Sequence, residues 1–127
     1  MTRESKTVEV DALIIGGGPA GLSAAIYTSR GNQSTIVLDG KKPSALELAH
    51  EIKNYPGYSS ISGEELLKNM REHARKSGAK IRKGDVISMA LDMTPKMIIT
   101  RDNTTYMAQS VIVATGRKMN DKLPNEE

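Results

Sequence analysis

The sequence predicts an α/β domain of three layers, with a central parallel sheet and a small antiparallel β-meander. Three observations support this prediction. An apolar run of strand length at residues 8–15 leads directly into a glycine-rich segment that can open a helix. A second apolar run follows at residues 35–38. From Lys80 onward the apolar residues recur with a period of two, which predicts strands rather than further helices.

The first strand ends in the segment GGGPAG, in which Gly16, Gly18 and Gly21 form the pattern G-x-G-x-x-G. In this pattern the first glycine permits a tight turn, the second lets the backbone approach a pyrophosphate, and the third lets the helix pack close to the strand. Pro19 suits the first helical turn because its missing N–H costs nothing there. The free amides of that turn predict a dinucleotide pyrophosphate site that needs no basic side chain.

The second strand ends at Asp39, which lies 18 residues after Gly21. This is near the spacing of an acid that accepts the ribose hydroxyls of a dinucleotide. A carboxylate in this position disfavours a 2′-phosphate, so FAD or NAD fits better than NADP. The alternative is a structural turn in which Asp39 is an ordinary solvated carboxylate at a strand end. Together the two features favour a Rossmann-like unit.

Residues 40–60 are predicted to be a long loop, because Gly40, Pro43, Pro56 and Gly57 interrupt them, with room for a helical turn around residues 44–49. A helix then begins at Ser62, where Glu65 completes a capping box, and it stops at Gly78. Its apolar face contains Leu66, Leu67, Met70 and Ala74. The opposite face carries Lys68, Arg71, Arg75 and Lys76. We interpret this basic face as solvated, with the docking of an acidic protein as the alternative.

Residues 86–91, 97–101 and 105–108 are predicted to be three short antiparallel strands, with a turn at Asp102 and Asn103. They would form a meander inserted into an otherwise βαβ chain. Residues 110–114 are predicted to be a final buried strand, which Thr115 and Gly116 follow. Open α/β sheets receive their ligands at the carboxyl ends of such strands, so this end is a second candidate ligand contact.

Composition excludes several classes of function. The length of 127 residues is that of one domain, and the net charge of +3 without interleaved aromatic residues disfavours nucleic acid as a partner. No apolar run is long enough to cross a membrane and no signal segment is present, so we expect a soluble, cytoplasmic protein. The chain has no Cys, which excludes thiol chemistry within it. His50 and His73 are too far apart in sequence to predict a metal site.

Four segments carry a family resemblance that covers essentially the whole chain. They are GGGPAGLSAAIYTSRG, NYPGY at residues 54–58, SGEELLKNM at residues 62–70 and VIVATGRKMNDKLPNEE at residues 111–127. Together they resemble the amino-terminal FAD-binding segment of low-molecular-weight thioredoxin reductases. In that family an NADPH domain with a C-x-x-C pair interrupts the FAD domain. The resemblance implies that residues 1–118 are the first segment of an incomplete FAD-binding domain, and that residues 119–127 begin the linker to a missing second domain.

The resemblance also implies which residues would contact FAD, whereas it implies no catalytic residue in this chain. Asp39 would bind the adenosine ribose, Val86 the adenine through its backbone, and Asn54 the edge of the isoalloxazine ring. The remaining candidate cofactor-binding residues are Gly16, Gly18, Pro19, Ala20 and Gly21 at the pyrophosphate, Gly40, Lys41 and Leu46 in the adjoining loop, and Ala114, Thr115 and Gly116 at the floor of the site.

One segment departs from the family pattern. The family usually has G-G-Q-L and then threonines before NYPG, where this chain has Pro43, Ser44, Ala45 and Leu46 followed by Glu47, Leu48, Ala49 and His50. The loop that faces the flavin therefore lacks a glutamine amide, and this leaves the electron donor open.

Two functions follow as expectations. The first is the FAD-binding part of a thioredoxin reductase-like oxidoreductase, a homodimer when complete, which passes electrons from NADPH or ferredoxin through FAD to a disulfide and on to a thioredoxin-like protein. Without Cys, this chain alone would be inactive. The alternative is a stand-alone nucleotide-binding or assembly module without turnover of its own.

Overall fold

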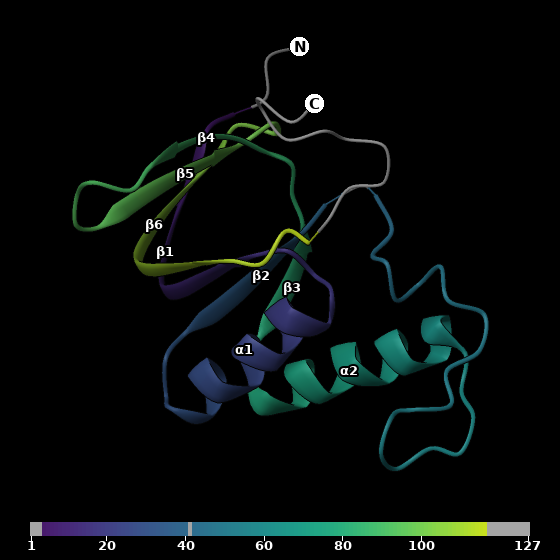
Figure 1. Ribbon diagram of the computed structural model, residues 1–127. Coiled ribbons are helices and arrows are strands. Elements are labelled where there is room, and N and C mark those ends of the chain that lie inside the picture. Colours follow the sequence, from purple (N-terminus) through teal and green to yellow (C-terminus); the bar gives the residue numbers. More distant parts are fainter. Residues whose placement is uncertain (1–3, 41, 117–127) are drawn as a thin grey trace.

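The computed structural model describes residues 4–40 and 42–116, which form one sheet and two helices (Figure 1). In chain order the elements are β1 (Lys6–Ile15), α1 (Pro19–Arg30), β2 (Thr35–Asp39), α2 (Gly63–Ser77), β3 (Lys80–Lys83), β4 (Val86–Ala90), β5 (Lys96–Thr100) and β6 (Thr104–Val113). The strands lie in the order β3-β2-β1-β6-β5-β4. The sheet is therefore continuous from its parallel part to its antiparallel part.

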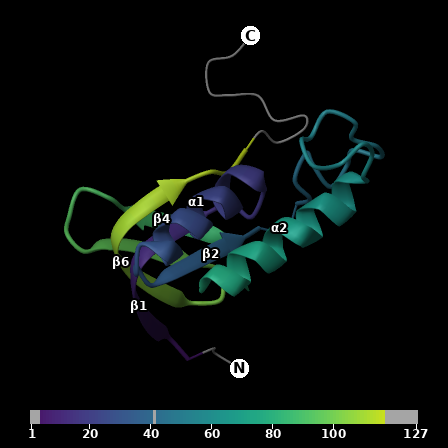
Figure 2. The same cartoon turned by 90° about the horizontal axis from the view of Figure 1, so that it is seen from below.

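The parallel part of the sheet consists of β3, β2, β1 and β6. The chain passes from β1 to β2 through α1 and from β2 to β3 through α2, and both helices lie side by side on one face of the sheet (Figure 2). Between helices and sheet the core is fully apolar, with Ile14, Val37, Leu22, Leu67 and Ala74 all buried. The predicted central parallel sheet is confirmed.

The predicted meander is present, but it is not a separate insertion. β4 pairs with β5, and β5 pairs with β6, in antiparallel register. β6 also pairs in parallel with β1 along its length, from the partners Lys6 and Thr104 to Ile15 and Val113. The prediction of separate strands at residues 105–108 and 110–114 was therefore wrong, because β1 is long enough to support one continuous strand.

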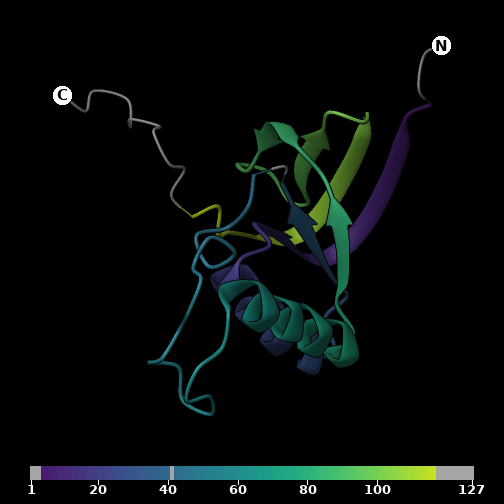
Figure 3. The ribbon, with the colours of Figure 1, turned by 90° about the vertical axis from the view of Figure 1, so that its right-hand side faces the viewer.

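A second apolar core lies on the sheet face opposite the helices. Halfway along their length, β1 and β6 each change the side that faces this second core. In β1 this side changes from Val8 and Val10 to Leu13 and Ile15, which breaks the alternation expected of a regular strand. β6 makes the same change between Ala108 and Val111, and the ladder between the two strands skips one pair at this point. The strands β4 and β5 thereby fold over the sheet face opposite the helices and form the third layer (Figure 3).

The end of β6 and the strand β3 differ from the prediction. Residues 110–114 were expected to form a buried strand, yet Val113 is 55% exposed and the strand stops before Ala114. Among the described strands, only β1 pairs with β6 beyond Ala108, so this half has one open edge. β3 was not predicted, because three of its four residues are cationic, and it pairs with β2 as an exposed edge strand.

The helix α2 begins and ends as predicted. The Ser62 hydroxyl accepts the backbone N–H of Glu65 at 3.1 Å, and Gly78 adopts the left-handed conformation at the carboxyl end with φ of 116°. The preceding loop contains the expected helical turn, in which the N–H of Leu48 donates to Ala45 O. The expected boundary at residue 118 and the linker at residues 119–127 lie outside the described residues.

His50 and His73 are both exposed, and the described residues contain no cluster of metal-binding side chains. Within the same part of the chain, neither helix is long and apolar enough to cross a membrane.

Candidate nucleotide-binding site

Packing of the protein itself requires glycine at two positions of the turn between β1 and α1. Gly16 has a φ of +121°, and a Cβ placed on it would lie 2.0 Å from Ala114 O. A Cβ on Gly21 would lie 1.9 Å from Gly16 O, so this glycine lets α1 approach the turn. Both roles match the sequence interpretation of a tight turn and a close helix.

Gly18 differs because no described atom explains it. Its φ is −85°, which any residue can adopt, and a Cβ on it would come no closer than 3.5 Å to any described atom, here Ser44 Cβ. The protein therefore leaves room for a Cβ at Gly18 and does not itself require glycine there. This is the position at which the motif brings the backbone against a pyrophosphate.

The start of α1 is suited to an anion. Pro19 occupies the first turn, and the first intrahelical bond runs from the N–H of Leu22 to Gly18 O at 3.0 Å. The amides of Ala20 and Gly21 consequently have no acceptor within the helix. No acidic residue lies in this first turn, so the helix dipole is not opposed by a local negative charge.

Asp39 ends β2 beside this turn and is largely buried. Its side chain is 13% exposed, and its Oδ2 lies 3.3 Å from Arg71 Nη2 and 3.2 Å from Lys83 Nζ. A Cβ on Gly17 would lie 2.6 Å from Asp39 Oδ1, so that oxygen lies on the side of the glycine turn. The alternative of an ordinary solvated carboxylate does not fit this burial.

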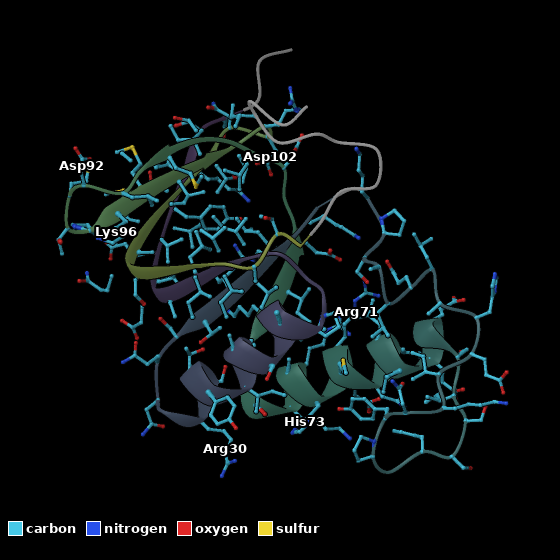
Figure 4. The ribbon with its side chains drawn as sticks, viewed as in Figure 1. Arg30, Arg71, His73, Asp92, Lys96 and Asp102 are labelled. Atoms are coloured by element: carbon cyan, nitrogen blue, oxygen red, sulfur yellow. The ribbon has the colours of Figure 1, made fainter. Side chains whose placement is uncertain are left out.

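Contrary to the sequence interpretation, the basic face of α2 is not solvated throughout, because Arg71 is partly buried. Lys68, Arg75 and Lys76 are exposed as expected, but the side chain of Arg71 is only 25% exposed. Arg71 reaches from α2 toward the segment that follows β2, whereas His73 lies on the outer side of the helix (Figure 4). Its Nη2 also lies 3.3 Å from Glu47 Oε1. The side chain is held by two carboxylates and is not available to an acidic partner.

The loop at residues 43–50, which departs from the family pattern, lies against the start of α2 and lines a cavity. The N–H of Gly63 donates to Ala49 O at 2.9 Å, and a Cβ on Gly63 would lie 1.8 Å from Leu46 O. The cavity has a volume of about 430 Å³, and its wall includes Pro19, Ala45, Leu46, Asn54, Tyr55 and Met70. The sequence candidates Pro19, Leu46 and Asn54 therefore meet in one mainly apolar space beside the start of α1.

The other candidates lie at the ends of neighbouring strands. The N–H of Ala114 donates to Ile15 O at 2.7 Å, which places Thr115 and Gly116 just beyond the sheet edge, both exposed. Val86 begins β4 and packs against the core. The N–H of Gly84, two residues earlier, donates to Asp39 O at 3.0 Å. Gly40 directly follows Asp39, and Lys41 lies outside the described residues.

Three residues of the site were missed as site residues at the level of sequence. Gly17 had a signal, because it lies within a run of three glycines. Arg71 also had one, since it follows the apolar Leu67 by four positions and so shares its helix face. Glu47 had none, because its pairing with Arg71 spans 24 residues.

Comparisons with known proteins indicate the family to which the chain belongs. Residues 10–127 match the family described as pyridine nucleotide-disulphide oxidoreductase. The thioredoxin reductase of Aquifex aeolicus is 44% identical over 108 residues, which cover 84% of this chain and 33% of the relative. The thioredoxin reductase of Bacillus subtilis is 41% identical over 107 residues, with coverages of 84% and 34%.

A solved structure shows the same likeness. Thioredoxin reductase from Giardia duodenalis matches with a TM-score of 0.83 and 35% identity, covering 91% of this chain and 39% of that chain. This chain spans about a third of the length of the Aquifex and Bacillus relatives. Because the family match extends over most of the sequence, the chain belongs to the pyridine nucleotide-disulphide oxidoreductase family, and its resemblance to thioredoxin reductases is confirmed.

Proposed function

We propose that this chain is the first FAD-binding part of a thioredoxin reductase-like flavoenzyme that passes electrons from NADPH or ferredoxin through FAD to a disulfide. The observation that carries the proposal is the contrast within the glycine turn. Gly16 and Gly21 are required by contacts of 2.0 and 1.9 Å that a Cβ would make, whereas Gly18 has no such contact among the described residues. Gly18 lies at the start of a helix, and no contact within the described protein requires glycine there. This supports a bound pyrophosphate at that position.

Different described residues would contact different parts of FAD. The amides of Ala20 and Gly21 would donate to the pyrophosphate, and Asp39 Oδ1 would accept from the adenosine ribose. Ala114, Thr115 and Gly116 would border the cofactor from the end of β6. When bound, the isoalloxazine ring supplies the redox chemistry, while the protein binds and orients it.

As part of this proposal, we place the isoalloxazine ring in the cavity beside the start of α1. Its volume of about 430 Å³ lies within the range of small-molecule sites, and its wall is mainly apolar. Asn54 contributes an amide that can donate and accept hydrogen bonds at the ring edge without titrating. Because the loop lacks the glutamine of the family pattern, Asn54 would provide more of the hydrogen bonding at the ring edge.

The rest of the electron path requires residues outside this chain. The chain has no Cys, so the thiols that exchange with a disulfide have to come from elsewhere. Among the described strands, none pairs with the second edge of β6 beyond Ala108, which supports an incomplete domain. We further propose a thioredoxin-like acceptor, a cytoplasmic location and a homodimer of the complete enzyme, each on the basis of the family resemblance.

Visible spectroscopy of the purified full-length protein tests this function. We expect a bound-flavin spectrum that bleaches when the physiological reductant is added, and NADPH and reduced ferredoxin are compared side by side. Reoxidation by a disulfide-bonded thioredoxin then identifies the acceptor. A protein that binds no flavin even after FAD is added contradicts the proposal. Flavin binding without reoxidation by any disulfide favours a binding or assembly module.

A further inference from the structure

Three charged side chains from three different elements meet beside the glycine turn. Arg71 Nη2, on α2, lies 3.3 Å from Asp39 Oδ2 at the end of β2 and 3.3 Å from Glu47 Oε1 in the loop. We call Asp39, Arg71 and Glu47 the arginine bridge. Its members are separated by 32 and 24 residues in sequence, so only the tertiary fold brings them together.

Burial makes the arginine bridge stronger than the ion pairs around it. The side chains of Asp39, Arg71 and Glu47 are 13%, 25% and 26% exposed. Lys83, which also contacts Asp39, is 79% exposed. Solvent screens partly buried pairs less than exposed ones, so Arg71 holds Asp39 more effectively than Lys83 does.

The Asp39 end of the bridge borders the adenosine side of the site. Arg71 and Lys83 both contact Oδ2, which fixes the carboxylate with Oδ1 toward Gly17. This orientation is the one needed for Oδ1 to accept a ribose hydroxyl. Loss of Arg71 would leave only the exposed Lys83 to hold the carboxylate in this orientation.

The Glu47 end borders the other half of the site. Glu47 Oε2 accepts the N–H of Ser44 at 3.0 Å, and the Ser44 hydroxyl accepts the N–H of Glu47 at 3.3 Å. Ser44 Cβ lies 3.5 Å from a Cβ placed on Gly18, so this turn forms the wall opposite the bare glycine. The same turn carries Leu46 into the cavity.

We propose that Arg71 is a positioning residue that couples the ribose end of the FAD site to the loop that lines the cavity. The inference rests on the proposed function. Arg71 fixes the acceptor Oδ1 through one bond and fixes the loop through the other. Glu47 is one of the residues by which this chain departs from the family loop, and its contact with Arg71 connects this loop to Asp39.

Two ligands separate this role from a general structural one. FAD would contact both ends of the site, whereas ADP would contact the glycine turn and Asp39 but not the cavity. A break at Glu47 should therefore weaken FAD more than ADP, and a break at Arg71 should weaken both. A merely structural contribution would lower both affinities by the same factor.

The experiment uses full-length protein from which the flavin has been removed. FAD affinity is measured by fluorescence quenching on rebinding, and ADP affinity by its competition with that rebinding, so that only the FAD site is observed. The variants are Glu47→Ala and Arg71→Met, with Lys76→Met as the control. Lys76 lies on the same helix, is 76% exposed and carries the same charge as Arg71, so the control matches the change in net charge.

We expect Glu47→Ala to weaken FAD about tenfold, in the usual range of coupling between sites, with ADP changed less than about twofold. Arg71→Met should weaken FAD at least as much and ADP about fivefold, and the losses of FAD affinity should be less than additive in the double variant because the two residues share one contact. Lys76→Met should leave both affinities unchanged.

Equal losses of FAD and ADP affinity in Glu47→Ala, or no loss of either, would overturn the coupling. Glu47→Ala decides the question alone if Arg71→Met does not fold, since the loop lies outside the core. A wild-type protein that binds no FAD would instead refute the proposed function, so the two failures are distinguishable.

Discussion

The glycine turn offers a matched pair of substitutions, Gly18→Ala and Gly21→Ala, that separates ligand space from protein packing. A Cβ on Gly21 would lie 1.9 Å from Gly16 O and 3.2 Å from Ile14 Cγ2. A Cβ on Gly18 would come no closer than 3.5 Å to any described atom. The same added atom therefore clashes with backbone at one position and makes only an ordinary van der Waals contact at the other.

The two substitutions should differ in stability by several kilocalories per mole. Overpacking of this kind costs about 1–3 kcal/mol, and we expect Gly21→Ala at the upper end because the obstacle is a backbone carbonyl rather than a mobile side chain. At the helix cap, Gly18→Ala loses up to about 1 kcal/mol of capping preference. It regains about 0.4–1 kcal/mol from the lower entropy of the unfolded chain. Its net effect on unfolding should stay within about 0.5 kcal/mol.

Urea unfolding and FAD binding together test this reasoning. Far-UV circular dichroism follows unfolding, because the chain has no Trp to report by fluorescence. Gly18→Ala should keep the unfolding midpoint of the wild type while FAD affinity falls at least about tenfold, since the added methyl crowds the pyrophosphate. Unchanged FAD affinity in Gly18→Ala, or a loss of stability equal to that of Gly21→Ala, would refute the distinction between the two glycines.

Three further predictions concern stability, each measured by urea unfolding. Ser62→Ala removes the hydroxyl that accepts the Glu65 N–H, so unfolding should become about 1 kcal/mol easier, and an unchanged midpoint would contradict the cap. Ser29→Ala removes a buried hydroxyl with no hydrogen-bond partner among the described residues, so the midpoint should hold or rise, whereas a clear fall would contradict this. The Thr100 hydroxyl donates to Asp102 and lowers the pKa of that carboxyl, so its stabilisation is present above about pH 4 and is lost as pH falls through the lowered pKa. Asp102→Asn should flatten the acid limb of the stability curve, and a limb parallel to that of the wild type would count against it.

Local patterns predicted the elements whose signals lie within a few residues. Pro19 after the glycines marked the start of α1, and Ser62 with Gly78 marked the ends of α2. The turn at Asp102 and Asn103 was confirmed, with Asn103 at a φ of 68°. These features follow from backbone preferences and short hydrogen bonds, which neighbouring residues determine.

Local patterns failed where pairing between distant strands decides the outcome. Gln109 looked like a gap between two predicted strands, yet β1 pairs with Ala108 before it and with Ser110 after it. The cationic strand β3 is held in the sheet by its parallel pairing with β2. The strand propensity of a segment does not reveal which distant strand it will pair with.

The sequence by itself determined the strand, glycine turn and helix that predict a pyrophosphate site, and the motifs that place the chain in its family. Only the tertiary structure decided that Gly18, unlike Gly16 and Gly21, has room for a Cβ within the protein. It also decided that Arg71 joins Asp39 to Glu47 instead of facing solvent. The physical reason is distance along the chain: turn geometry and helix capping act between neighbours, whereas an ion pair across 24 or 32 residues depends on how helix, strand and loop pack.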